Sequence, residues 1–110
     1  MAIEQVYTYT RPNNSKGWFM DSNAGKTAIA AIMSNMATYI DNGQMKKKLE
    51  YVSENQVKVT QRFVSKSVKD QFDNDAAFAD VRAKRQAHCD ANLITVAIGS
   101  ETTVDSINFD

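Results

Sequence analysis

Residues 45–63, MKKKLEYVSENQVKVTQRF, hold two runs of alternating apolar and polar side chains around a short polar turn. Such alternation is typical of β-strands, because successive side chains point to opposite faces of a sheet. We expect strands over 45–52 and 56–64, with the turn at Ser53-Glu54-Asn55. Two alternating runs joined by so short a turn predict an antiparallel hairpin.

One face of the first predicted strand is apolar except for a single lysine. Met45, Leu49 and Tyr51 lie on the inward face, where Lys47 interrupts them. In the second strand Val57, Val59 and Phe63 form the inward set, opposite Lys58, Thr60 and Arg62. Lysines on an outer strand are expected to solvate it and to oppose edge-to-edge pairing.

The segments around the hairpin predict two further strands and two helical regions. The chain opens with a β-branched and aromatic strand, and Ile29, Ile32, Met33, Met36 and Ile40 form the apolar stripe of a helix that Asn42-Gly43 ends. Asp73-Asn74-Asp75 interrupts the second helical region. The continuous apolar run LITVAI predicts a last strand buried on both faces. The predicted ranges are 3–11 (strand), 26–41 (helix), 65–72 and 76–91 (helical), and 93–98 (strand).

The order strand, helix, strand, strand, helix, strand predicts an α+β, ferredoxin-like β-α-β-β-α-β fold. We expect one domain over 1–110, with its core in 3–98, a four-stranded antiparallel sheet and both helices on one face. An apolar uncovered face would require a second sheet, which a homodimer supplies. In the tail 99–110, the weak alternation of Val104, Ile107 and Phe109 predicts either an extra edge strand or an arm that contacts a partner.

Composition excludes several classes of protein. The formal net charge is zero, so no strong field points to a nucleic acid or an acidic membrane. The third-strand motif of RNA-recognition domains is absent from QVKVTQRF. No segment has the length of a membrane span, and the N-terminal residues lack a secretory signal pattern. One cysteine, Cys89, precludes an intrachain disulfide, which fits a cytoplasmic protein.

The segment SNAGKTAIAAI, residues 22–32, contains the Gly-Lys-Thr that ends many phosphate-binding loops. That loop requires a second glycine five residues before Gly25, where this chain has Met20. A helix start capped by Ser22 or Asn23 is the better interpretation.

Single residues offer little catalytic chemistry. His88 is the only histidine, so a multi-histidine metal site is excluded, and it is the one weak candidate for a proton shuttle. Cys89 is expected to be a buried apolar cysteine rather than a nucleophile. We expect no metal and no cofactor, and the sequence leaves open whether the protein is an enzyme.

Three segments together resemble the dimeric α+β-barrel superfamily, especially antibiotic-biosynthesis-monooxygenase-like domains. They are VYTYT at 6–10, QRFVSKSVKDQF at 61–72 and AAFADVRAKRQAH at 76–88. The residues that would occupy the pattern are Phe63, Ser65, Val68, Phe72, Phe78 and His88. The resemblance implies two sheets that close a barrel across a dimer interface, and a ligand cleft between each sheet and its helices. Cofactor-free oxidation is the chemistry that it implies.

An excess of aromatic residues suits such a cleft, since small-molecule sites are mainly apolar with a few polar anchors. Arg82, Arg85 and His88 are candidates to anchor a carboxylate or carbonyl at its mouth. The predicted ligand-binding residues are Tyr7, Tyr9, Trp18, Phe19, Phe63, Phe72, Phe78, Arg82, Arg85 and His88. We therefore predict a homodimer that binds a small apolar or amphipathic molecule, such as a fatty acid, quinol or polyketide-like compound. The alternative is a non-catalytic interaction protein whose sheet face serves only dimerisation.

Overall fold

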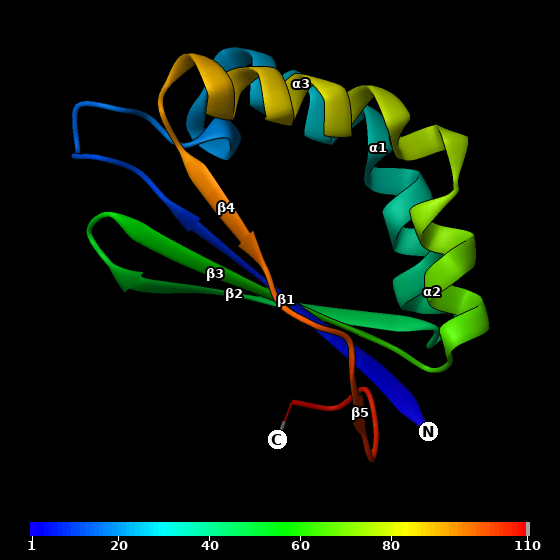
Figure 1. Cartoon of the computed structure of the whole chain (residues 1–110). Coiled ribbons are helices and arrows are strands. Elements are labelled where there is room, and N and C mark those ends of the chain that lie inside the picture. The colour runs from blue at the N-terminus through cyan, green and yellow to red at the C-terminus, as the bar shows by residue number, and fades with distance from the viewer. Residues whose placement is uncertain (110) are drawn as a thin grey trace.

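A computed structural model describes residues 1–109 and has the predicted order of elements (Figure 1). The strands form one antiparallel sheet in the order β2-β3-β1-β4, with β5 also paired to β1. The α+β, ferredoxin-like prediction is confirmed, but the sheet has five strands rather than four. The elements are β1 (Ala2–Thr10), α1 (Asn23–Asp41), β2 (Met45–Ser53), β3 (Gln56–Phe63), α2 (Lys66–Asp73), α3 (Ala79–Ala91), β4 (Thr95–Ile98) and β5 (Thr102–Val104).

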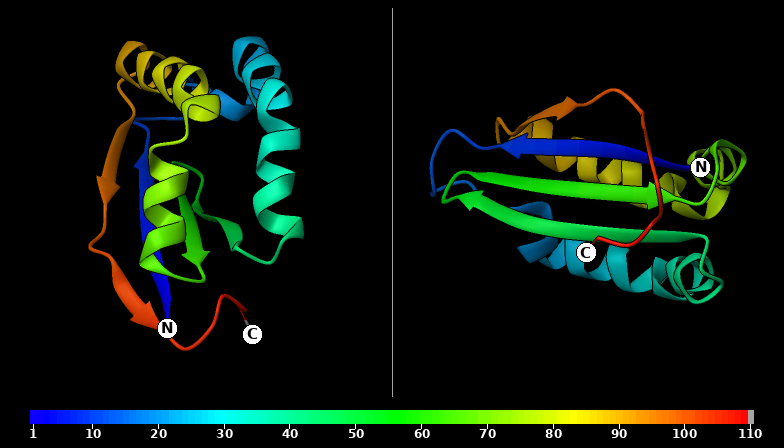
Figure 2. Two further views of the ribbon diagram at one scale, coloured as in Figure 1. Left: turned by 90° about the vertical axis from the view of Figure 1, so that its right-hand side faces the viewer. Right: turned by 90° about the horizontal axis from the view of Figure 1, so that it is seen from below.

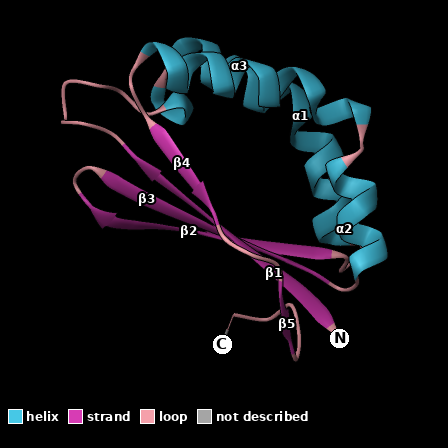
Figure 3. Cartoon of the chain, in the orientation of Figure 1, coloured by secondary structure: helices cyan, strands magenta, loops and turns pink. Residues whose placement is uncertain are grey.

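All three α-helices cover the same face of the sheet (Figures 2 and 3). The predicted interruption of the second helical region is present, and it separates α2 from α3. There the Asp75 carboxylate accepts a hydrogen bond from the Ala77 amide and caps a short 3-10 helix at Ala76–Phe78. The break lets α2 and α3 run in different directions, so that both remain on the sheet (Figure 1).

Strand register sorts the inner face of the sheet, which the helices cover, into rows of side chains. Met45, Phe63 and Ile3 are register partners and form the first row, where Met45 and Phe63 are fully buried. Lys47, Gln61 and Gln5 form the second row. The third row holds Leu49, Val59, Tyr7 and Ile98, and the fourth holds Tyr51, Val57, Tyr9 and Val96. A single polar row therefore crosses an otherwise largely apolar face.

The outer face is largely polar, so the structure does not have the apolar uncovered face that would require a second sheet. Register pairs Glu4 with Arg62, and an ion pair of 2.7 Å joins them. Tyr7 and Tyr9 point to the helices instead, because they share a face with the buried Val57. The segment after β5 lies across this outer face (Figure 2). There the Arg62 guanidinium lies over the Phe109 ring, 4.6 Å from its centroid.

The last predicted strand also differs from expectation. The chain at Leu93 has φ of 58°, in the left-handed region, so the strand begins only at Thr95. The prediction that this strand is buried on both faces was wrong as well, because β4 is an edge strand of the sheet and Ala97 and Ile98 are exposed. The tail does form the extra edge strand that was one of its two predicted alternatives, as β5 pairs with Ala2–Glu4.

The buried core is divided into two clusters. The larger one surrounds Phe63, Phe72 and Phe78. The ring centroid of Phe72 lies 4.7 Å from that of Phe78 and 5.4 Å from that of Phe63. The smaller cluster holds Trp18, Val57, Cys89 and Ile94. The two clusters fasten the helices to the sheet at separate places.

The Gly-Lys-Thr segment has a structural explanation. The Ser22 hydroxyl accepts a hydrogen bond from the Gly25 amide and caps α1, as predicted. A Cβ on Gly25 would lie only 1.7 Å from the Phe19 carbonyl oxygen, so the backbone approach requires glycine. Gly25 thus holds the short 3-10 helix Phe19–Asp21 against the start of α1.

We predict that Gly25→Ala lowers the free energy of unfolding by about 1–3 kcal/mol or more, because the new methyl group overlaps backbone atoms that cannot rotate away. Chemical denaturation measures the change. Gly17→Ala is the matched control, since a Cβ at that position would have no atom within 4 Å. Equal stability of both variants and the wild type would contradict the packing described for Gly25.

Candidate functional site

A cavity of about 650 Å³ lies between the inner face of the sheet and the helices. Its volume is within the range of roughly 300–1,000 Å³ that is typical of small-molecule sites. Its walls are mainly apolar, and Met33, Ile40, Leu49 and Ile98 line it although each is at least 40% exposed. Exposed apolar side chains that converge on one space form a surface that a ligand would cover favourably.

Eight of the ten predicted ligand-binding residues line this cavity. They are Tyr7, Tyr9, Trp18, Phe19, Phe72, Phe78, Arg82 and Arg85. The apolar loop of residues 17–20 contributes Trp18 and Phe19, which are almost fully buried, and Met20. Arg11 stacks over the Trp18 ring at 4.7 Å and donates a hydrogen bond of 2.8 Å to the Lys16 carbonyl, which fixes the loop.

Phe63 and His88 lie outside the cavity lining. Phe63 is fully buried in the larger core cluster. The His88 Nε2 lies 2.7 Å from the Gly17 carbonyl, and because a carbonyl only accepts, this nitrogen must carry the proton. Its ring also packs on Phe19 at 5.7 Å. In this structure His88 therefore joins α3 to the apolar loop and does not face the cavity.

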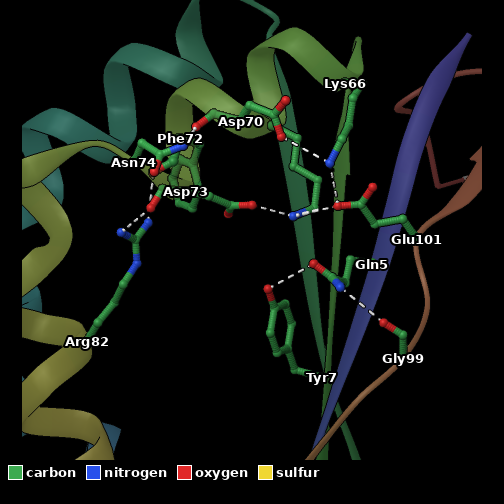
Figure 4. Close-up of polar contacts among 11 residues, drawn as sticks. Gln5, Tyr7, Lys66, Asp70, Phe72, Asp73, Asn74, Arg82, Gly99 and Glu101 are labelled. Atoms are coloured by element: carbon green, nitrogen blue, oxygen red, sulfur yellow. Dashed lines mark hydrogen bonds and ion pairs between the residues drawn. The ribbon is translucent and has the colours of Figure 1, made fainter.

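A cluster of charged side chains lies beside the cavity, where α2 meets the sheet, and within the described part of the chain Asp73 is its only member that lines the cavity. The buried Lys69 ammonium lies 2.5 Å from an Asp73 oxygen and 3.1 Å from a Glu101 oxygen (Figure 4). Burial lowers the pKa of Lys69, but the hydrogen bonds that its ammonium donates to these two carboxylates outweigh burial, so the pKa is above its ordinary value. Hydrogen bonds from Lys66 and Lys69 lower the pKa of Glu101. These charges are therefore mutually compensated.

Two tyrosines bring hydroxyl groups to the cavity. Tyr7 donates a hydrogen bond of 3.1 Å to the Gln5 side chain, whose amide donates to the Gly99 carbonyl (Figure 4). Burial raises the pKa of Tyr7 and also that of Tyr9. Both hydroxyls are thus neutral near pH 7, where they can donate or accept a hydrogen bond but do not supply charge.

The arginines at the cavity are in different situations. The Arg82 guanidinium donates to the carbonyls of Phe72 and Asp73 at 2.8 and 2.9 Å, so it is committed to the end of α2. Arg85 lines the cavity half-buried, and within residues 1–109 it has no hydrogen bond or ion pair. The free guanidinium is therefore that of Arg85.

Lys47 is a site residue that was not predicted from the sequence. Its side chain lines the cavity from β2, on the same face as Met45 and Leu49. Although the Lys47 side chain is exposed, partial desolvation at the cavity wall lowers its pKa, and the Arg85 charge lowers the pKa further. The signal was present in the sequence, because alternation placed this lysine inward, where a cation is unexpected.

Metal chemistry has no evident place at the site. Among residues 1–109, no three His, Cys, Asp or Glu side chains gather as metal ligands would. Cys89 is buried in the smaller core cluster, and burial raises the pKa of its thiol.

None of the described helices is long and apolar enough to span a bilayer.

Comparison with known proteins shows that several solved structures have a fold similar to that of this chain. No family model matches the sequence, and no curated protein is significantly similar to it. SnoaB, a cofactor-independent oxygenase from Streptomyces nogalater, is 11% identical, with a TM-score of 0.56 over 96% of this chain and 94% of SnoaB.

Two further solved structures have the same arrangement. A dimeric ferredoxin-like protein from an uncultured marine organism is 13% identical, with a TM-score of 0.53 over 94% of this chain and 95% of its own. Rv0793 from Mycobacterium tuberculosis is 14% identical, with a TM-score of 0.52 over 94% and 99%. The element order, the sheet topology and these likenesses agree with the resemblance in the sequence. The chain therefore shares the ferredoxin-like α+β fold of these solved structures, which is the fold that the resemblance in its sequence implies.

Proposed function

We propose that this protein binds a small apolar or amphipathic molecule in the cavity between the sheet and the helices. The observation that carries the proposal is the cavity itself, whose mainly apolar wall is left open to solvent. Covering apolar surface is favourable by roughly 25 cal/mol per Å². Residues from all four main strands and from all three α-helices contribute to the wall, so the fold holds the site in a defined shape.

An oxygenase reaction is a further step of the same proposal. SnoaB, whose fold is similar, is a cofactor-independent oxygenase. Such a reaction would need proton-transfer groups beside the bound molecule, and the Tyr7 hydroxyl and the Asp73 carboxylate both line the cavity. Ligand binding is the part of the proposal that the geometry supports directly.

We also propose that the protein is a homodimer, as the likeness to a dimeric ferredoxin-like protein suggests. The outer face of the sheet is the candidate interface, because no helix covers it (Figure 2). Its opposite charges, among them Glu4, Glu50, Lys58 and Arg62, offer self-complementary contacts to a second copy.

The ligand proposal predicts saturable binding of N-phenyl-1-naphthylamine, a neutral apolar fluorophore, with enhanced emission. Val59→Trp fills the middle of the cavity and is expected to weaken this binding at least about 10-fold. Lys84→Trp is the matched control, because it places the same ring on the exposed side of α3, outside the cavity lining. Thermal unfolding shows that both variants are folded. Unchanged binding by folded Val59→Trp, or no binding by the wild type, would contradict the proposal.

The dimer proposal predicts a mass of twice the 12.3 kDa chain by light scattering at micromolar concentration. Thr8→Lys places a second positive charge beside its register partner Lys58, in the middle of the outer face, and should shift the protein towards monomer. Lys84→Glu, on the exposed side of α3, should leave the dimer intact. A monomeric wild type would refute the dimer and, with it, the alternative that the protein serves only as a dimerisation module.

A further inference from the structure

Two cationic side chains enter the cavity without a protein counter-ion. Lys47 enters from β2 and Arg85 from α3, on the sheet wall and the helix wall respectively. Within residues 1–109, neither side chain makes a hydrogen bond or an ion pair to another residue. Both line the same cavity, and the Arg85 charge lowers the pKa of Lys47. The structure thus places two like charges on the walls of one mainly apolar space.

The other charged groups at the cavity do not neutralise this pair. Asp73 is the one carboxylate in the described lining, and its side chain is already paired with Lys69 at 2.5 Å. Arg82 adds a third positive charge, although its guanidinium donates to backbone carbonyls. The local charge of the cavity wall is therefore positive, while the whole chain is neutral.

Two like charges that face the same space repel each other, and an anion bound between them removes the repulsion. A guanidinium offers two parallel N–H donors to an anionic oxygen group, and an ammonium adds a third donor. Gln61 is the register partner of Lys47 and also lines the cavity, so its amide supplies a neutral donor next to the lysine. The adjacent row, with Leu49, Val59 and Ile98, is apolar across the sheet.

We infer that the ligand of this cavity is an amphipathic organic anion, with its charged oxygen group between Lys47 and Arg85 and its apolar part against the row of Leu49, Val59 and Ile98. The inference rests on the proposed function and adds the charge of the ligand and the residues that select it. A fatty-acid-like carboxylate is the simplest molecule of this class.

A matched pair of probes tests the inference. Dodecanoate and 1-dodecanol have the same chain length and differ in charge, and both are titrated against bound N-phenyl-1-naphthylamine below their aggregation limits at low salt. Dodecanol is the more apolar of the two, so the hydrophobic effect alone favours it. We expect the wild type to bind dodecanoate at least about 10-fold more tightly, since hydrogen bonds to charged groups stabilise by roughly 1.5–3 kcal/mol.

Lys47→Gln and Arg85→Gln keep a polar side chain of similar length and remove one charge each. Each variant should weaken dodecanoate binding about 10-fold while the affinity for dodecanol stays the same. Lys84→Gln, on the exposed side of α3 and outside the cavity lining, is the control for the loss of one positive charge from the chain and should leave both affinities unchanged.

The outcomes separate this inference from the proposed function. Equal or weaker binding of dodecanoate than dodecanol by the wild type would overturn the anion selectivity and leave the apolar site intact. A preference for dodecanoate that persists in both Lys47→Gln and Arg85→Gln would overturn the assignment of these residues. Binding of neither dodecanoate nor dodecanol nor the fluorophore would contradict the proposed function, and the inference would fail with it.

Discussion

The division of the core into two clusters is the constraint on which the rest of this structure depends. Phe63, Phe72 and Phe78 fasten the helices to one end of the sheet, and Trp18 with Val57 fastens them at another place. A helix layer that is held at two separate places need not touch the sheet between them. The cavity of about 650 Å³ is the consequence, and the break between α2 and α3 lets the helices reach both clusters.

The same division explains why exposed apolar residues gather in one place. In a domain with a single closed core, a side chain such as Leu49 or Met33 would be covered by its neighbours. Here both are more than a third exposed and face the same space. The apolar wall, together with Lys47 and Arg85 as unpaired cations, forms a site with one apolar part and one charged part. That combination favours an amphipathic ligand over a purely apolar one.

Local sequence patterns predicted much of the fold. Alternation predicted the hairpin, and the Asp73-Asn74-Asp75 break was correctly placed because an aspartate can cap the helix that follows. The sequence did not show that Leu93 has a positive φ, since this conformation is rare for leucine and is imposed by the turn after α3. Nor did it show that the outer face is polar, because that depends on which face of β1 meets the helices.

The site was only partly predictable for a related reason. Aromatic residues such as Tyr9 and Trp18 could be assigned to a cleft by composition, but packing alone decided that Phe63 belongs to the core. His88 was a candidate because of its chemistry, whereas its position depends on a contact with Gly17 that is 71 residues distant in sequence. The sequence showed Lys47 as a polar residue at an inward position of the alternating strand, but only the structure shows that it lines a cavity.

The most direct test of the central claim is a crystal structure of the protein with dodecanoate. The account predicts one molecule of dodecanoate between the two core clusters, with its chain on Leu49, Val59 and Ile98. It also predicts that the helix layer stays in the position it has without ligand. A structure in which Met33 and Ile40 have closed onto Leu49, leaving no space between the clusters, would contradict the account.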